Sequence, residues 1–141
     1  MKKIVLYLVI AAVVVFGLIQ LVPFGHDHTN PATVSEPNWA SPQARALVKQ
    51  SCFQCHSNET AWPWYSNIAP ASWLISMDVI EGRQRFNFSD WQNNPGELDE
   101  MTEAISSGEM PPLQYWIFHP SSRLNDQQKQ DLIQALQQSI Q

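Results

Sequence analysis

The hydrophobic and polar positions divide the chain into one long apolar run and several shorter amphipathic stretches. The run Ile4–Val22 contains a single polar residue, Gln20, and no charged one. As a helix that rises 1.5 Å per residue, it would span about 28 Å, close to the roughly 30 Å of bilayer hydrocarbon. It predicts a membrane-spanning helix. A buried core helix fits less well because the run has no polar face.

The charges next to this run predict its orientation. Lys2 and Lys3 precede it, and the positive-inside rule keeps them in the cytoplasm, so that the remainder is exported. A cleaved signal peptide is the alternative, but its apolar region would be shorter and small residues would follow it. We therefore expect an uncleaved anchor over residues 1–24 in the inner (cytoplasmic) membrane, with the rest of the chain on the periplasmic side.

A segment with many proline and polar residues follows the anchor. Residues 25–40 contain few apolar side chains and predict a tether that leads to a domain over residues 41–141. His26 and His28 lie in this tether. Because no third ligand is near them in sequence, we interpret them as polar residues at the level of the lipid headgroups rather than as a metal site.

Four amphipathic stretches predict helices in the exported domain. The first begins at the capping pair Ser41-Pro42 and runs towards Cys52, and the second follows Pro70. The third covers about residues 96–106, and the last begins at the capping residue Asn125. Their apolar faces carry Ala44, Leu47 and Val48; Trp73, Leu74, Met77 and Ile80; Leu98, Met101 and Ile105; and Leu132, Ile133, Leu136 and Ile140. Since no segment alternates like a strand, the fold class is all-α.

The charge balance limits the partners of this domain. The 141 residues carry a net charge of −5. With Lys2 and Lys3 set aside, 6 basic residues face 13 acidic ones, a balance of −7. Such a surface repels phosphate, which argues against a nucleic-acid binder and favours a protein partner with a basic face.

The chemistry is concentrated in Cys52-Phe53-Gln54-Cys55-His56. Two cysteines three positions apart with a histidine directly after them are the attachment signature of c-type haem. One helical turn spaces the two sulfurs for thioether bonds to one porphyrin, and His56 then reaches the iron. A zinc site lacks ligands, a thioredoxin-like pair lacks its βαβ context, and a disulfide across so short a loop stabilises little.

A second axial ligand is expected if the iron serves electron transfer. Met110 lies in a loop that leads to an extended stretch, and the proline after it disfavours helical geometry, so that its thioether is available as the distal ligand. Met77 and Met101 fall on helix faces that we expect to point inward as core filler. His119 and an iron site without a second protein ligand remain the alternatives.

Aromatic residues are gathered after the haem motif. Trp62, Trp64, Tyr65 and Trp73 suit the large apolar pocket that a porphyrin needs, and indole N–H groups can bond its propionates. The alternative is that they form an ordinary core, which is the better interpretation for any single tryptophan. By charge, Arg83 and Arg85 could pair with the propionates as well, although we expect each to lie on the surface.

The chain resembles the bacterial haem-binding domain family, which comprises small membrane-anchored proteins similar to c-type cytochromes. The resemblance lies in Gln20–Pro23, Thr29–Pro31, Cys52–Trp91 and Glu103–Leu124, and Cys-x-x-Cys-His and Trp-Pro-Trp-Tyr-Ser are its most specific motifs. It implies one haem c bound covalently to Cys52 and Cys55, with His56 as the proximal and Met110 as the distal ligand.

These observations together predict a cytochrome c-like monohaem domain that carries single electrons and is not an enzyme. The alternatives are a haem-based sensor or ligand-binding module and a peroxidase-like enzyme, both with an open iron site. The expected partners are a redox protein with a basic docking face and, through the N-terminal helix, the membrane.

Overall fold

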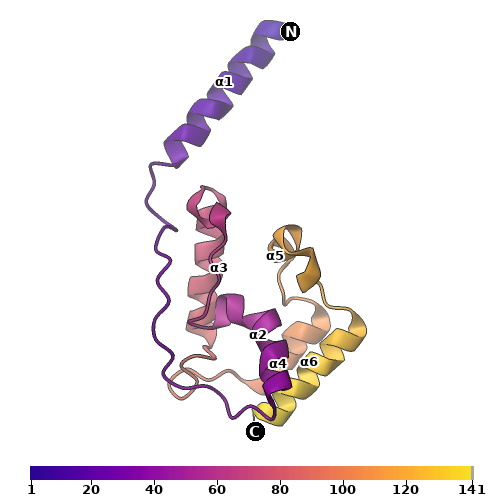
Figure 1. Ribbon diagram of the computed structural model, residues 1–141. Coiled ribbons are helices and arrows are strands. Elements are labelled where there is room, and N and C mark those ends of the chain that lie inside the picture. Colours follow the sequence, from indigo (N-terminus) through magenta and orange to yellow (C-terminus); the bar gives the residue numbers. More distant parts are fainter. Residues whose placement is uncertain (141) are drawn as a thin grey trace. The chain divides into compact units, whose positions relative to one another are not determined.

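Helices make up the regular structure of the protein. A computed structural model describes residues 1–140, in which no strand occurs and only an isolated bridge joins Ser35 to Asp90. The prediction of an all-α fold is therefore confirmed. Gln141, the last residue of the predicted domain, lies outside the described residues. The elements are α1 (Lys2–Ile19), α2 (Pro42–His56), η1 (Trp64–Asn67), α3 (Ala71–Arg85), α4 (Leu98–Ser107), α5 (Leu113–Phe118), η2 (Pro120–Ser122) and α6 (Asp126–Ser139) (Figure 1).

The predicted helix starts are confirmed where a capping residue announces them. Ser41 caps α2, and its hydroxyl accepts a hydrogen bond from the N–H of Ala44 at 3.0 Å. Asn125 caps α6 in a capping box, in which the side chains of Asn125 and Gln128 each accept a bond from the other residue's backbone N–H. Each bond satisfies an N–H group that the first helical turn leaves without a partner.

Two interpretations of the pattern are wrong. The apolar face predicted for the second helix does not point inward: Leu74, Met77 and Ile80 are 52%, 46% and 44% exposed. Helix α3 instead buries Ser72, Ser76, Val79 and Gly82, most of which are small. Small side chains allow the neighbouring backbone to approach closely, and hydropathy does not detect such a face. The stretch after Met110 is also not extended, because Pro112 precedes the short helix α5 and its carbonyl accepts a bond from Tyr115 N–H.

The chain divides into two compact units, which we describe separately. The second unit comprises residues 30–61 and those from 79 onward. Within it, α6 packs against both α2 and α4. Their facing sides, together with Phe88 from the connection between α3 and α4, form a core of Ala44, Val48, Phe53, Phe88, Met101, Ile105, Leu132, Ala135 and Leu136. The inward placement predicted for Met101, Ile105, Leu132 and Leu136 is thus confirmed.

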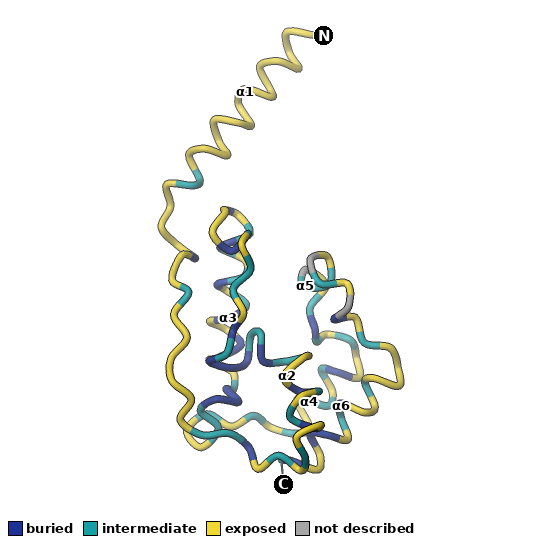
Figure 2. The backbone as a smooth tube through the Cα atoms, in the orientation of Figure 1, coloured by how far each residue is buried: buried dark blue, intermediate teal, exposed yellow. Residues whose placement is uncertain are grey.

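The first unit comprises residues 1–29 and 62–78. Its helix α1 is exposed along almost its whole length (Figure 2) and is long and apolar enough to cross a membrane. The buried residues elsewhere in this unit are small, namely Gly25, Ser66, Ala69, Ser72 and Ser76.

The segment that we predicted as a tether is shared between the two units. From residue 30 to residue 40 it makes backbone bonds within the second unit, where Val34 N–H donates to Ser89 O at 2.8 Å and Trp91 N–H donates to Ser35 O at 3.1 Å. Ala40 N–H donates to the hydroxyl of Ser139. The domain boundaries at residues 24 and 40 remain a prediction.

Candidate functional site

The Cys-x-x-Cys-His motif forms the last turn of α2, which ends at His56 without a glycine. A helix end leaves four carbonyl groups without an intrahelical partner. The hydroxyl of Ser57 donates to the carbonyl of Phe53 at 2.7 Å, and the hydroxyl of Thr60 donates to that of Gln54 at 2.9 Å. The residues directly after the motif therefore hold its helical turn in place.

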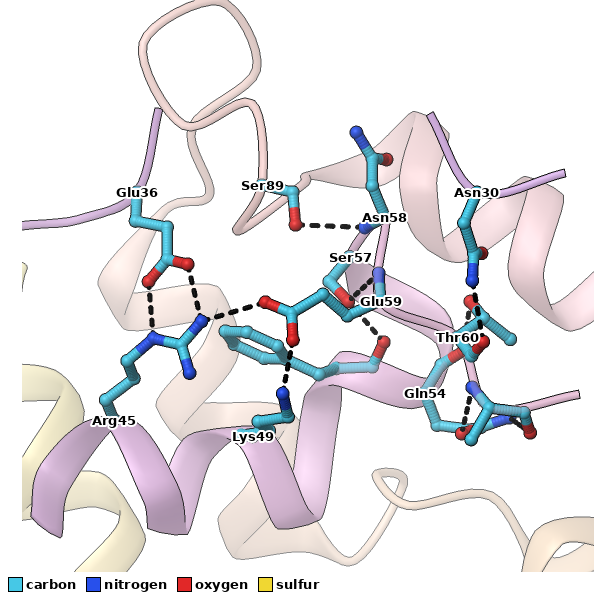
Figure 3. A network of polar contacts seen from close by, with 12 residues as sticks. Asn30, Glu36, Arg45, Lys49, Gln54, Ser57, Asn58, Glu59, Thr60 and Ser89 are labelled. Carbon is cyan, nitrogen blue, oxygen red and sulfur yellow. Dashed lines mark hydrogen bonds and ion pairs between the residues drawn. The ribbon is translucent and has the colours of Figure 1, made fainter. Parts of the chain in front are cut away.

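A second layer of polar groups fixes the residues that follow His56. Phe88 N–H donates to the carbonyl of His56 at 2.8 Å. Asn58 N–H donates to the Ser89 hydroxyl at 3.0 Å, and its side-chain oxygen accepts a bond from the amide of Asn87 at 2.9 Å. These groups are buried, and buried polar groups that have partners define one arrangement of the backbone. Figure 3 shows Asn58 and Ser89 in this network.

Four charged residues stabilise the outer side of the same region (Figure 3). Arg45 donates to both carboxylate oxygens of Glu36, at 2.7 and 2.6 Å, and to Glu59 at 2.8 Å, while Lys49 pairs with Glu59. The bond from Arg45 lowers the pKa of Glu36, and the bond from Lys49 lowers the pKa of Glu59. These bonds fasten Glu36, which precedes α2, and Glu59, which follows it, to side chains of the helix.

Arg83, which lies on α3, also joins the polar network. Its Nε donates to the carbonyl of Ser57 at 2.8 Å, and its Nη2 donates to Asn30 Oδ1 at 2.8 Å and to Thr60 Oγ1 at 3.1 Å. The expectation of a surface position is wrong for Arg83, which is half-buried because these carbonyl and hydroxyl groups need a multivalent donor. It is right for Arg85, which is exposed.

The imidazole of His56 is buried and neutral. It stacks on the ring of Phe86, with the two centroids 4.0 Å apart and the planes 9° from parallel. Burial lowers the pKa of His56 to about 4. Its Nδ1 atom is buried and has no hydrogen-bond partner among the described residues. A neutral imidazole is the form that binds a metal ion.

The two cysteines are half-buried thiols on the same turn. Burial raises the pKa of Cys52 to about 12, so that this thiol is protonated at neutral pH. A redox-active pair of the thioredoxin type has a lowered thiol pKa, because the thiolate is the reactive form. The electrostatics of Cys52 therefore disfavour that alternative.

Helices α2 and α3 come into close contact at Cys55, within the motif. Gly82 is buried, and a Cβ atom added to it would lie 2.7 Å from the carbonyl oxygen of Cys55. Only a residue without a side chain allows the two helices to come this near. The glycine thus determines how closely α3 lies behind the motif.

Met110, the residue that we predicted as the distal ligand, lies in the same unit as His56. It is half-buried, and its N–H donates to the carbonyl of Ala104 at 3.0 Å, which fixes its backbone to the end of α4. His119, the alternative, follows α5 and stacks on Tyr115 with centroids 4.3 Å apart.

The four aromatic residues that we predicted for the pocket all belong to the first unit. Trp62, Tyr65 and Trp73 are half-buried, and Trp64 is exposed. The indole nitrogens of Trp62 and Trp73 are buried and have no hydrogen-bond partner among the described residues. Their role in a haem pocket stays a prediction.

Comparison with known proteins identifies the family. The profile of the haem-binding domain family matches residues 14–138, which is most of the chain. The protein belongs to the haem-binding domain family. No curated protein and no solved structure matched the chain in the comparisons made.

The residues of the motif fit a haem group. A haem-binding domain needs an iron ligand, and His56 supplies a neutral imidazole with a buried nitrogen that lacks a partner. Cys52 and Cys55 supply two thiols on the same helical turn. If haem is bound here, His56 is the candidate iron ligand and the two cysteines are the candidate attachment points.

Sequence reasoning missed the residues that support this haem-binding motif. Nothing in the sequence pattern marks Gly82, Phe86 or Asn58 as neighbours of His56, because they come from separate parts of the chain. One usable signal was present: Ser57 and Thr60 follow a helix end that lacks a glycine, and short hydroxyl side chains are suited to cap free carbonyls.

Proposed function

We propose that this haem-binding domain carries one haem c, bonded covalently through Cys52 and Cys55, and that it works as a one-electron carrier. One observation carries the proposal: two thiols and a buried neutral imidazole occupy the last turn of α2 in the order Cys-x-x-Cys-His. When bound, the haem supplies an iron that gains and loses a single electron.

The protein residues have positioning roles in this function. The ring of Phe86 stacks on the imidazole of His56, and the N–H of Phe88 donates to the carbonyl of His56. Both contacts keep the imidazole in one orientation. Met110 would bind the iron as a second protein ligand, and ligation by a histidine and a methionine would raise the potential of the haem. Since the transfer of an electron requires no side chain that makes or breaks a covalent bond, we infer that the protein is not an enzyme.

We further propose that α1 is an uncleaved anchor in the inner membrane and that the haem unit lies in the periplasm. The support is the apolar length of α1, and Lys2 and Lys3 at its start. Haem c is attached beyond the cytoplasmic membrane, which agrees with an exported motif.

The acidic surface suits a redox partner with a basic face. Exposed acids gather on and beside α4, namely Glu97, Asp99, Glu100, Glu103 and Glu109. Opposite charges speed the encounter of two proteins, and salt screens the attraction. Electron transfer to a basic partner should therefore slow by tenfold or more as salt increases, given the usual range of electrostatic steering.

The spectrum of the oxidised protein tests the electron-transfer assignment. The full-length protein should show the weak long-wavelength band of methionine bound to ferric haem. Met110→Ala should abolish this band, whereas Met77→Ala, a change at an exposed methionine, should leave it unchanged. An unchanged spectrum in Met110→Ala would remove Met110 from the iron, and fast carbon monoxide binding by the reduced wild type would favour a sensor or a peroxidase-like enzyme.

A further inference from the structure

The end of α1 is joined by hydrogen bonds to a distant loop of the first unit. Gln20 directly follows α1, and its side chain forms two bonds with the backbone of Ala69. Nε2 donates to the carbonyl of Ala69 at 3.0 Å, and Ala69 N–H donates to Oε1 at 2.9 Å. A side-chain amide that meets both backbone groups of one residue fixes that residue's position and orientation.

The residues after Gln20 contact the start of α3 and the same loop. Gly25 lies so close to α3 that an added Cβ would be 2.5 Å from the carbonyl oxygen of Ser72. The His28 ring stacks on Trp62 with centroids 4.4 Å apart, and its Nε2 lies 3.2 Å from the carbonyl oxygen of Ser66. The loop is therefore held against the chain that leaves α1, and Figure 1 shows the start of α3 beside this chain.

This loop, residues 62–70, has the composition of a lipid-facing surface; we refer to it as the aromatic tip. Trp64 is 76% exposed and Ile68 is 37% exposed. No charged residue occurs between Glu59 and Asp78, although the exported chain is rich in acids. An exposed tryptophan in an uncharged segment costs free energy in water and is typical of the membrane–water interface.

We infer that the aromatic tip lies in the headgroup layer of the bilayer that α1 crosses, where Trp64 and Ile68 contact phospholipid. The inference rests on the proposed membrane anchor. The argument for this position is that Gln20 lies at the end of α1, near the boundary of the hydrocarbon layer. Because Gln20 bonds both backbone groups of Ala69, the aromatic tip lies near the same boundary. For Trp64 this assignment takes the place of the predicted role in the haem pocket.

Photo-crosslinking of the full-length haem protein in vesicles tests the inference. Trp64→p-benzoylphenylalanine keeps a large aromatic side chain at the tip, and the vesicles contain phosphatidylethanolamine and phosphatidylglycerol. After irradiation, mass spectrometry of the peptide that contains residue 64 should find phospholipid adducts. Crosslinks to a second copy of the chain, or no adducts at all, would overturn the lipid assignment.

A second position separates failure of the inference from failure of the anchor. Val14→p-benzoylphenylalanine places the same probe in the middle of α1, where the anchor predicts lipid adducts. Adducts at residue 14 without adducts at residue 64 would contradict the inference and leave the anchor standing. Absence of adducts at both positions would contradict both.

The role of Gln20 is tested in the same system. Gln20→Leu removes both bonds to Ala69 and puts an apolar side chain of similar size at the helix end. Adducts at residue 64 should decrease at least threefold in this background, while adducts at residue 14 should not change. An unchanged yield at residue 64 would show that Gln20 does not hold the tip at the membrane, which contradicts the inference as stated.

Discussion

The two compact units bury opposite kinds of residue. The second unit encloses large apolar side chains, such as Phe53, Phe88 and Leu132, between its helices. The first unit buries glycine, alanine and serine and leaves large residues such as Trp64 and Leu74 exposed. Because burial of apolar area drives folding in water, the second unit has the interior of a water-soluble domain and the first does not.

This difference assigns different tasks to the two units. In the second unit, a buried core and a network of polar groups both support the helical turn that carries His56, so that the geometry of this turn is maintained in water. The first unit has little core of its own, and its outward-facing apolar residues are suited to a surrounding that is not water.

Truncation of a leucine in each unit should have unequal effects. Leu132→Ala removes a fully buried side chain and should lower the free energy of unfolding by about 2–5 kcal/mol. Leu74→Ala removes a side chain that is 52% exposed and should change it by less than about 0.5 kcal/mol. Urea unfolding in detergent, followed by circular dichroism, measures both, and equal losses would contradict the contrast.

Loss of Arg83 should weaken the region around the motif. Arg83→Ala leaves the carbonyl of Ser57 and the hydroxyl of Thr60 without their charged donor, and should cost about 1.5–3 kcal/mol of unfolding free energy. Arg83→Lys keeps the charge but not the planar fork and should recover only part of this loss. Full recovery by lysine would mean that charge, and not the hydrogen-bond geometry, is what matters. The same urea titration provides the measurement.

A methyl group between α2 and α3 should disturb the motif itself. Gly82→Ala forces a Cβ against the backbone of Cys55 and should destabilise the protein by about 1–3 kcal/mol and shift its haem absorption spectrum. Gly17→Ala in α1 has nothing within 4 Å and serves as the matched control. The close approach would be refuted by a Gly82→Ala protein whose stability and spectrum equal those of the control.

Acid should weaken the ion-paired side of the second unit. The pKa values of Glu36 and Glu59 are lower in the folded protein than in the unfolded chain, so their stabilisation is present above the unfolded value of about 4.3 and is lost as pH falls below it. Glu59→Gln should therefore reduce stability by about 0.2–1 kcal/mol at pH 7 and flatten the decline between about pH 5 and pH 3. Chemical unfolding at several pH values checks this; an equally steep decline in the variant would remove Glu59 from the acid response.

The sequence predicted the elements whose signals are local. Helix starts follow from capping residues such as Ser41 and Asn125, and the inward residues of α4 and α6 follow from apolar spacing. The Cys-x-x-Cys-His motif is visible in the sequence because its three residues lie on one helical turn.

The remaining features depend on contacts between distant residues. The buried face of α3 consists mainly of small residues, which a hydropathy pattern does not detect. The inward placement predicted for Leu74, Met77 and Ile80 is therefore wrong. Arg83 is half-buried because it bonds Asn30, Ser57 and Thr60, which are distant from it in sequence. Gln20 and Ala69 are likewise far apart in sequence. Spacing along one helix contains no information about such partners.

The mass of the denatured chain tests the central proposal most directly. Full-length protein made together with a c-type maturation system should have the mass of the polypeptide plus one haem and should stain for haem after denaturing electrophoresis. The double variant Cys52→Ser/Cys55→Ser should have the bare mass and no stain. A wild-type chain that has the bare mass under these conditions would contradict covalent haem attachment at this motif.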